Sequence, residues 1–368
     1  MFVISTRNFP PELGGIQTLM GGLAEHLLNY GPVKIFADKK SDQDKPHDEK
    51  SSLDIERIAG IKLFRKYRKS GVVNEFIKNQ NNIRALILDH WKSLEHLDKN
   101  IISKTKVICL IHSKEINFPI NSSQNKRIIK SMSKADSIVS NSNFTKQLAI
   151  NLGIEKQKIK IIFPGINKPQ KIENKFDLES KNIFQNSFPK IITVARLEKR
   201  KGHEKILMSI KNLKAKYPNI KYVSIGSGNE KNNLAKLCKE LGLDKEVSFL
   251  ENIDSSLKIA LIKNSNLFLM PTIVDSKSVE GFGISYVEAA SYGVSSIGGK
   301  DGGASDAISH EKTGLICDGN DLNSIYSSIE KIIQNEKYKE FGKEAEKFSK
   351  KFYWNKVVQE YINLIKSL

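Results

Sequence analysis

The sequence predicts an α/β protein built from two doubly wound, Rossmann-like domains. Short apolar runs alternate with helical patterns from one end of the 368-residue chain to the other, as in βαβ units with mostly parallel sheets. The length exceeds what one ordinary hydrophobic core needs, which favours two domains. A composition of 39% hydrophobic and 27% charged residues is typical of a soluble globular protein.

The first domain is predicted to span residues 1–168. Apolar runs predict its strands at Phe2–Ser5, Val33–Phe36, Arg84–Leu88, Lys106–Ile111, Ser137–Val139 and Lys160–Phe163. Apolar residues at helical spacing predict helices at Gly15–Asn29, Lys126–Lys134 and Asn143–Leu152. Residues 166–186 follow a Pro-Gly pair and lack a clear period, so we interpret them as the connection between the domains.

The second domain is predicted to span residues 169–351 and to repeat this pattern. Its predicted strands are Ile191–Ala195, Lys221–Ile225, Val247–Leu250, Leu267–Met270, Ser295–Ile297 and Gly314–Ile316. Its predicted helices are His203–Tyr217, Lys231–Leu241, Ser256–Asn264, Leu322–Gln334 and Tyr338–Lys350. The amphipathic C-terminal helix, within residues 352–368, is predicted to cross back and pack on the first domain. Because ligands of such sheets bind at the carboxyl ends of the strands, we expect the domains to face each other across one cleft.

The formal net charge of +18 lies mainly in the first half of the chain. Residues 1–170 carry 28 Lys and Arg against 16 Asp and Glu, whereas residues 171–368 carry 31 against 25. The excess is densest in residues 62–69, where Leu63, Phe64 and Tyr67 interrupt the bases. This segment is either a solvated basic loop or a contact for an anionic membrane surface, and nucleic-acid binding is a third alternative.

The cysteines and the absence of long apolar runs indicate where in the cell the protein is expected. Cys109, Cys238 and Cys317 are odd in number and far apart, which predicts neither a disulfide framework nor a zinc site. We expect them to be reduced residues in or near the core of a cytoplasmic protein. No apolar run approaches the roughly 18 residues of a membrane span, and the N-terminal residues do not resemble a secretion signal.

Two carboxylates, Glu280 and Glu288, flank a glycine-rich turn that follows an apolar strand and opens a helix. The first N–H groups of a helix lack internal partners and the helix dipole favours negative charge there, so the turn is a candidate diphosphate site. Carboxylates repel phosphate but accept hydroxyls, which suggests a ligand with sugar hydroxyls on both sides of its phosphates. The alternative is an ordinary helix start with two solvated glutamates.

Three other features are compatible with a phosphate ligand. Gly15 lies in the βα turn after the first strand, where backbone N–H groups can face a phosphate, although the turn is not a dinucleotide fingerprint. Arg196 and Lys201 follow the first strand of the second domain and could stabilise charge on a leaving diphosphate. An ordinary turn and a basic surface loop are the respective alternatives. His112, at a strand end, is by itself more typical of a structural histidine.

A series of short motifs runs through both halves of the chain. The second half contains Val194-Ala195-Arg196-Leu197 with Lys201-Gly202, Ile225-Gly226-Ser227-Gly228, Val247-Ser248-Phe249-Leu250, Glu280-Gly281-Phe282-Gly283 with Glu288-Ala289, Gly302-Gly303-Ala304 and Thr313-Gly314-Leu315. The first half adds Pro10-Pro11 with Gly14-Gly15-Ile16-Gln17, and Ala135-Asp136 with Ser140-Asn141-Ser142-Asn143-Phe144-Thr145. In this order the motifs resemble retaining glycosyltransferases of family 4, which have the GT-B fold. The likeness is strongest to bacterial phosphatidylinositol-mannoside mannosyltransferases.

The resemblance implies a role for each matching residue. Arg196 and Lys201 would hold the donor diphosphate, Glu288 would accept from ribose hydroxyls, and Glu280 would bind the transferred sugar near its reacting carbon. The remaining expected contacts are Gly281, Phe282, Gly283 and Ile284 beside the sugar and phosphates, Gly15 opposite them, Leu250 and Ile253 at the base, and His112 facing the sugar.

The resemblance also implies the reaction, a hexosyl transfer with retention of configuration. The donor would be a UDP- or GDP-sugar, acting as co-substrate, with no metal or other cofactor required. The acceptor would be a hydroxyl of a glycan or a lipid-linked precursor in cell-envelope polysaccharide or glycolipid synthesis. The expected location is the cytoplasm, including the inner face of the cell membrane, and nucleic acid is not an expected partner.

The sequence departs from the family pattern at two places, and two other functions are alternatives. Glu251 stands where many family members have glycine, which weakens the assignment of the base site. Residues 40–80 and 89–122, the expected acceptor region, carry no motif that matches. The rival functions are a sugar-nucleotide epimerase or synthase of the same fold and, in another class, a basic nucleic-acid-binding protein.

Overall fold

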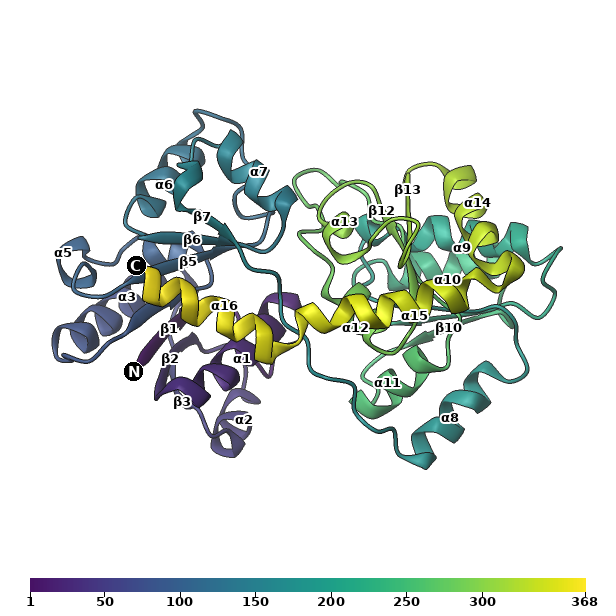
Figure 1. Ribbon diagram of the computed structural model, residues 1–368, viewed down its shortest axis with the longest axis horizontal. Helices are drawn as coiled ribbons and strands as arrows, with labels where there is room; N and C mark the ends of the chain where they lie inside the picture. The colour runs from purple at the N-terminus through teal and green to yellow at the C-terminus, as the bar shows by residue number, and fades with distance from the viewer. The chain divides into compact units, whose positions relative to one another are not determined.

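The computed structural model describes residues 1–368, apart from the side chain of Lys62. The chain forms two compact units (Figure 1). Unit 1 comprises Met1–Ile166 and Phe352–Leu368, and unit 2 comprises Asn167–Lys351. The chain thus passes into unit 2 after Ile166, whereas the sequence suggested residue 168.

Unit 1 is built on a seven-stranded parallel sheet in the order β3-β2-β1-β4-β5-β6-β7. The strands are β1 (Phe2–Thr6), β2 (Val33–Asp38), β3 (Asp54–Ile58), β4 (Ala85–Leu88), β5 (Val107–Ile111), β6 (Ser137–Ser140) and β7 (Ile159–Ile161). The helices are α1 (Gly15–Leu27), α2 (Asp44–Lys50), α3 (Lys62–Lys78), α4 (Trp91–Leu94), α5 (Lys99–Ile102), α6 (Ser123–Met132), α7 (Asn143–Asn151) and the C-terminal α16 (Trp354–Ser367).

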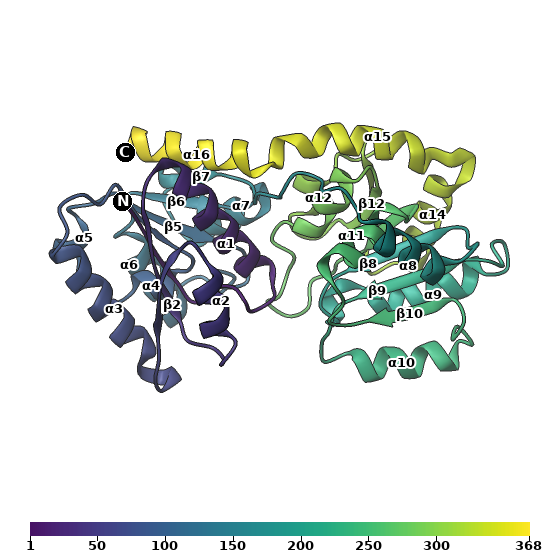
Figure 2. The ribbon, with the colours of Figure 1, turned by 90° about the horizontal axis from the view of Figure 1, so that it is seen from below.

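Each face of the unit 1 sheet carries its own core, because side chains alternate between the faces along a strand. In β1, Phe2 and Ile4 pack with α1 and α16, whereas Val3 packs on the opposite face with α3 to α7. Figure 2 shows α1 and α16 side by side on one face of this sheet. Trp354 anchors α16 against Gly22 and Gly165, where an added Cβ would lie 2.4 Å and 2.3 Å from the indole.

Unit 2 is built on a six-stranded parallel sheet in the order β10-β9-β8-β11-β12-β13. The strands are β8 (Lys190–Val194), β9 (Lys221–Ile225), β10 (Val247–Leu250), β11 (Leu267–Met270), β12 (Ser295–Gly299) and β13 (Gly314–Cys317). The helices are α8 (Asn174–Phe184), α9 (His203–Leu213), α10 (Lys231–Glu240), α11 (Ser255–Lys263), α12 (Ile284–Ser291), α13 (Ala304–Ala307), α14 (Leu322–Ile333) and α15 (Lys337–Ser349).

Both sheets have a point where the strand order reverses. It lies between β1 and β4 in unit 1 and between β8 and β11 in unit 2. In open parallel sheets the loops that leave the carboxyl ends of such strands diverge, which creates a crevice for ligands. The two loops that leave β8 and β11 contain Lys201 and Glu280.

Two local predictions were wrong, and one of the alternatives weighed for a third segment does not hold. The strand β3 was missed because its sequence, Asp-Ile-Glu-Arg-Ile, is half polar and lies at the edge of the sheet. Residues 166–186 are not a plain connection, since they contain α8, whose Ser180 and Phe184 are buried. The basic segment 62–69 is the first half of α3 rather than a loop.

Candidate functional site

Glu280 is the centre of a buried charge cluster in unit 2. The Oε2 oxygen accepts from Nη1 of Arg200 at 2.8 Å and from Nζ of Lys201. The three side chains are only 9% to 13% exposed. Burial opposes ionisation of Glu280, but the charges and hydrogen bonds of Lys201 and Arg200 outweigh it and lower the pKa of this carboxyl from 4.5 to about 2. The glutamate is therefore a fixed anion at neutral pH.

The cluster keeps unused hydrogen-bonding capacity. Both cations contact Oε2 of Glu280, so Oε1 remains able to accept hydroxyl groups. Lys201 has three donors, of which one reaches Glu280 and one points to the Sδ of Met270 at 3.5 Å. The third makes no hydrogen bond among the described residues. A carboxylate acceptor and an ammonium donor are thus presented side by side.

Arg200 was not predicted as a site residue, whereas Arg196 was. Arg196 is 62% exposed and pairs with Glu198 at 2.8 Å. Glu198 also pairs with Nε of Arg200 at 2.9 Å, which links the exposed arginine to the buried cluster. The sequence signal for Arg200 is only the run Lys199-Arg200-Lys201, and a basic run does not reveal which members turn inward.

His203 holds the loop that carries these cations. Its Nδ1 lies 3.1 Å from the hydroxyl of Tyr222 and its Nε2 lies 3.3 Å from the carbonyl oxygen of Arg196. Burial lowers the pKa of His203 to about 4, despite the opposing hydrogen bond to Arg196. The imidazole is therefore neutral at pH 7 and holds the loop through these two contacts.

The start of α12 provides backbone donors next to Glu280. Gly283, the residue before the helix, has φ +89°, a conformation that side-chain-bearing residues rarely adopt. Among the described residues no side chain caps this end, and its first turn contains no acidic residue. The terminal N–H groups of Ile284 and Ser285 thus belong to an uncapped helix start, which favours an anion. Gly281 and Phe282, also predicted, are buried beneath it.

A second glycine loop holds the Glu280 turn in place. The N–H of Gly303 donates to the carbonyl oxygen of Glu280 at 2.9 Å. A Cβ added at Gly303 would lie 2.0 Å from the carbonyl oxygen of Gly281, and one added at Gly302 would lie 2.4 Å from that of Glu280. Close backbone approach therefore requires glycine at both positions.

The variant Gly303→Ala is expected to lose about 2 kcal/mol of unfolding free energy, because a methyl group there must displace the backbone of the Glu280 turn. Gly71→Ala is the matched control, since an added Cβ meets nothing within 4 Å at this position in α3. That control should gain about 0.5–1 kcal/mol from helix propensity. Urea denaturation of both variants measures the difference, and equal midpoints would refute the close-packing argument.

The other predicted donor residues of unit 2 lie on neighbouring elements. Leu250 ends β10, and Ile253 lies between that strand and α11; both are partly exposed. Glu288 lies one helical turn inside α12 and is 4.0 Å from Lys258 of α11. The ion pair therefore connects the helix that bears Glu288 to the helix that follows the expected base site. Glu251, the departure noted above, pairs with Lys231 at 2.6 Å.

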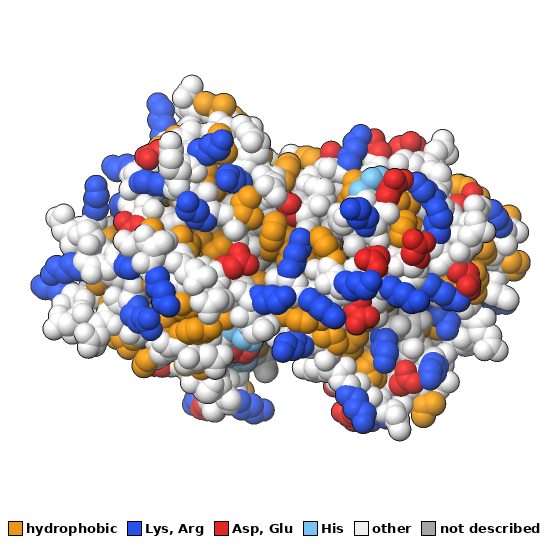
Figure 3. Space-filling view, viewed as in Figure 1, with side chains coloured by type: hydrophobic (Ala, Val, Ile, Leu, Met, Phe, Trp, Pro, Cys, Tyr) orange, Lys and Arg blue, Asp and Glu red, His pale blue; other side chains and the backbone are white. Residues whose placement is uncertain are grey.

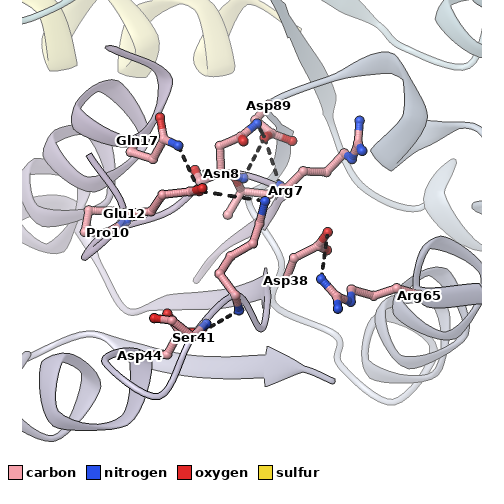
Figure 4. Close-up of polar contacts among 12 residues, drawn as sticks. Arg7, Asn8, Pro10, Glu12, Gln17, Asp38, Ser41, Asp44, Arg65 and Asp89 are labelled. Atoms are coloured by element: carbon pink, nitrogen blue, oxygen red, sulfur yellow. Dashed lines mark hydrogen bonds and ion pairs between the residues drawn. The ribbon is translucent and has the colours of Figure 1, made fainter. Parts of the chain in front are cut away.

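Two predicted residues lie in unit 1. Gly15 is exposed at the first position of α1, which no described side chain caps. Nearby, Gln17 donates to Glu12 at 2.9 Å (Figure 4). His112 follows β5 and is only 8% exposed, with Nε2 2.9 Å from the carbonyl oxygen of Asp89. This contact orients the imidazole and leaves Nδ1 as its second polar atom.

The basic segment at the start of α3 uses its cations for local contacts. Lys69 is buried and donates to Asp38 and to the carbonyl oxygen of Thr6, both at 2.7 Å. The apolar side chains between the bases are exposed, Leu63 by 69%, Phe64 by 55% and Tyr67 by 51%. The side chain of Lys62, part of the predicted patch, lies outside the described residues. Elsewhere, lysines and arginines are scattered over both units on the face shown in Figure 3.

The three cysteines are free and buried, as expected for reduced core residues. No group of three or more His, Cys, Asp or Glu side chains among these residues could hold a metal ion. No helix in the described part of the chain is long and apolar enough to cross a membrane.

Comparisons with known proteins agree with the fold. Residues 174–348 match the family model described as "Glycosyl transferases group 1". A GDP-mannose-dependent alpha-(1-6)-phosphatidylinositol monomannoside mannosyltransferase of Mycolicibacterium smegmatis is 20% identical over 342 residues, covering 89% of this chain and 87% of the relative. Anabaena Alr3699/HepE, solved in complex with UDP, is similar with a TM-score of 0.82 at 17% identity, over 100% of both chains. Sucrose-phosphate synthase of Thermosynechococcus elongatus has a TM-score of 0.79 at 17% identity, over 100% of this chain and 99% of its own.

These findings confirm two predictions made from the motifs. The fold is GT-B, with one Rossmann-like sheet in each unit. The likeness to phosphatidylinositol-mannoside mannosyltransferases holds across most of the chain at low identity.

Proposed function

We propose that this protein, whose second unit carries a glycosyl transferases group 1 domain, is a retaining glycosyltransferase that moves a hexosyl group from a nucleotide sugar to an acceptor hydroxyl. The observation that carries the proposal is the buried cluster of Glu280, Arg200 and Lys201 beside the uncapped start of α12. The two loops together offer a hydrogen-bond acceptor for sugar hydroxyls and hydrogen-bond donors for phosphate oxygens. A sugar diphosphate requires both.

The donor is proposed to lie along the carboxyl edge of the unit 2 sheet. Its diphosphate binds at the N-terminus of α12, where the backbone N–H groups, Lys201 and Arg196 balance the charge. The transferred sugar lies toward Glu280, whose Oε1 accepts its hydroxyls. The ribose lies toward Glu288 and the base toward Leu250 and Ile253. This orientation uses the carboxylates only where the ligand has hydroxyls.

The reaction breaks the bond between the anomeric carbon and the diphosphate oxygen. The acceptor oxygen attacks the same face of the sugar, and its proton passes to the departing phosphate oxygen, giving a glycoside and a nucleoside diphosphate. Lys201 and the N–H groups of α12 stabilise the negative charge that develops on the leaving group. Fixed donors of this kind need no rearrangement when the bond breaks. We propose that no metal ion or other cofactor takes part.

The relatives support two donor classes. The Mycolicibacterium smegmatis relative is named as GDP-mannose-dependent, whereas Anabaena HepE was solved with UDP. We therefore propose a UDP- or GDP-sugar. By the same comparison we propose a glycan or lipid-linked acceptor, because the relative acts on a phosphatidylinositol mannoside.

Contact with a membrane is part of this proposal. The exposed Leu63, Phe64 and Tyr67 of α3 lie among bases that favour anionic headgroups. We propose a cytoplasmic protein that reaches its acceptor at the inner face of the cell membrane, in polysaccharide or glycolipid synthesis.

Binding of the correct nucleotide is expected to raise the melting temperature, because a ligand that binds only the native state stabilises it by mass action. UDP, GDP and ADP and their hexose derivatives are compared by thermal unfolding. Glu288→Gln should weaken binding of the protecting nucleotide about tenfold, since charge-assisted hydrogen bonds to the ribose become neutral ones.

Glu240→Gln, a substitution of an exposed carboxylate in α10, is the control and should leave the melting shift unchanged. A protein that none of these nucleotides protects, but that binds DNA tightly at moderate salt, would overturn the proposed function in favour of nucleic-acid binding.

A further inference from the structure

The carboxyl edge of the unit 1 sheet carries a second group of titratable side chains. Arg7 follows β1, Asp89 and His90 follow β4, and His112 follows β5. These strands are neighbours in the order β1-β4-β5, and the first two flank the point where the strand order reverses. Parallel strands present their carboxyl ends at one edge, so the residues meet at the ligand-binding edge of this unit.

Asp89 organises this edge without contributing a free acceptor. Its Oδ2 accepts from the N–H groups of Arg7 at 2.8 Å and Asn8 at 3.2 Å, and from the side-chain amide of Asn8 at 3.2 Å (Figure 4). Its Oδ1 accepts from the hydroxyl of Ser93 at 3.0 Å. The carboxylate is fully buried, so its hydrogen bonds fix the loop after β1 relative to the loop after β4.

Two cations at this edge have no carboxylate partner within ion-pairing distance among the described residues. Arg7 binds Asp89 only through its backbone, and in Figure 4 its side chain extends away from Asp89. Lys92 lies 5.3 Å from the ring centroid of Trp91 and forms no ion pair. Lys69, in contrast, is neutralised by Asp38 at 2.7 Å. Arg7 and Lys92 are both partly exposed, so a ligand can reach them.

A buried imidazole, that of His90 in the loop after β4, lies next to Lys92. His90 is 8% exposed, and its Nδ1 accepts from the N–H of Lys92 at 3.0 Å. Burial, followed by the charges of Arg7 and Lys92, holds the pKa of His90 well below its usual value. The imidazole is therefore neutral at pH 7 and adds no positive charge of its own to this edge.

We propose that Arg7 and Lys92 form a subsite for a phosphate group on the acceptor. A guanidinium matches two phosphate oxygens with its planar fork, and an ammonium adds a point charge, so the pair suits a phosphate better than a neutral sugar. The inference rests on the proposed function, because it names the class of acceptor. The phosphate belongs either to a lipid headgroup or to a soluble phosphorylated compound.

The test uses the full chain and two phosphate probes. Glycerol 3-phosphate against glycerol isolates the soluble phosphate, and phosphatidylglycerol vesicles against phosphatidylcholine vesicles isolate the lipid headgroup. Melting shifts are measured for the soluble probes and co-sedimentation for the vesicles, in wild type, Arg7→Gln, Lys92→Gln and the control Lys78→Gln, an exposed lysine at the end of α3. A nucleotide that protects the protein is present throughout, so that the donor site is filled.

Each substitution at the subsite is expected to weaken binding of the phosphate probe about tenfold, whereas Lys78→Gln leaves it unchanged. Loss confined to glycerol 3-phosphate identifies a soluble acceptor, and parallel loss on phosphatidylglycerol vesicles identifies a headgroup. Equal binding of the phosphate probes by all four proteins, or no phosphate-dependent binding at all, would overturn the subsite. Nucleotide protection is read in the same samples, so failure of the donor assignment is seen separately.

Discussion

Glu280→Gln is expected to reduce transfer by about 10²- to 10³-fold, the loss typical of removing one preorganised electrostatic contact in a reaction centre. The substitution keeps the shape of the side chain but removes the anion that, in the proposed complex, orients the transferred sugar. Transfer is measured as release of nucleoside diphosphate from the nucleotide sugar that protects the protein best, with a lipid and glycan extract supplying acceptors. Activity within threefold of wild type would contradict the assignment of Glu280.

The same variant should also be less stable, by about 3 kcal/mol at neutral pH, because the buried Lys201 loses its carboxylate partner and the buried Arg200 keeps only Glu198. The folded-state pKa of Glu280, about 2, lies below the ordinary value of 4.5. Its ionisation therefore stabilises the protein fully above about pH 4.5, and this stabilisation is lost as the pH falls toward 2. Urea unfolding of wild type and Glu280→Gln should differ equally at pH 7 and pH 6 and converge below pH 4. A difference that instead grew on acidification would contradict the pairing.

Lys201→Ala is expected to lower transfer about 100-fold and to weaken nucleoside diphosphate binding about tenfold. The ammonium contacts Glu280, and in the proposed complex it also donates to the diphosphate, so its removal should affect the leaving group and the sugar contact together. Nucleotide affinity from isothermal titration, combined with the release assay, separates the two effects.

Lys199→Ala is the matched control for this variant. Lys199 belongs to the same short turn as Lys201 but is exposed and forms no ion pair with a carboxylate among the described residues. It should retain wild-type affinity and transfer. Equal losses in the two variants would show that the net charge of the loop, rather than the position of Lys201, determines binding.

Much of the fold could be predicted from the sequence, because several strands in both sheets are short apolar runs that alternate with amphipathic helices. Strands such as Leu267–Met270 are buried on both faces, and a run of consecutive apolar residues predicts such a strand directly. The strand that was missed, Asp54–Ile58, pairs with β2 on one side only. An edge strand with one solvent-exposed face keeps polar residues at alternate positions.

Site residues could be predicted where a backbone motif places them. They could not be predicted where only tertiary contacts between side chains place them. The glycine turn before α12 placed Glu280 and Glu288 on either side of a helix start, as the structure shows. The sequence could not show that Arg200 turns inward to Glu280, because the direction of its side chain depends on the three-residue helical turn at Lys199–Lys201. Arg7 and Lys92 could not be predicted for the same reason, because only tertiary contacts bring the loop after β1 and the loop after β4 together.

The central claim is that the donor binds with its sugar toward Glu280 and its ribose toward Glu288. Isothermal titration of the nucleotide sugar and of its nucleoside diphosphate tests this directly in Glu280→Gln and Glu288→Gln. The account predicts that Glu280→Gln keeps or improves diphosphate affinity, since Arg200 and Lys201 are released, but loses the extra affinity that the sugar provides. It predicts that Glu288→Gln weakens both ligands equally. The reverse pattern, or an unchanged sugar contribution in Glu280→Gln, would contradict it.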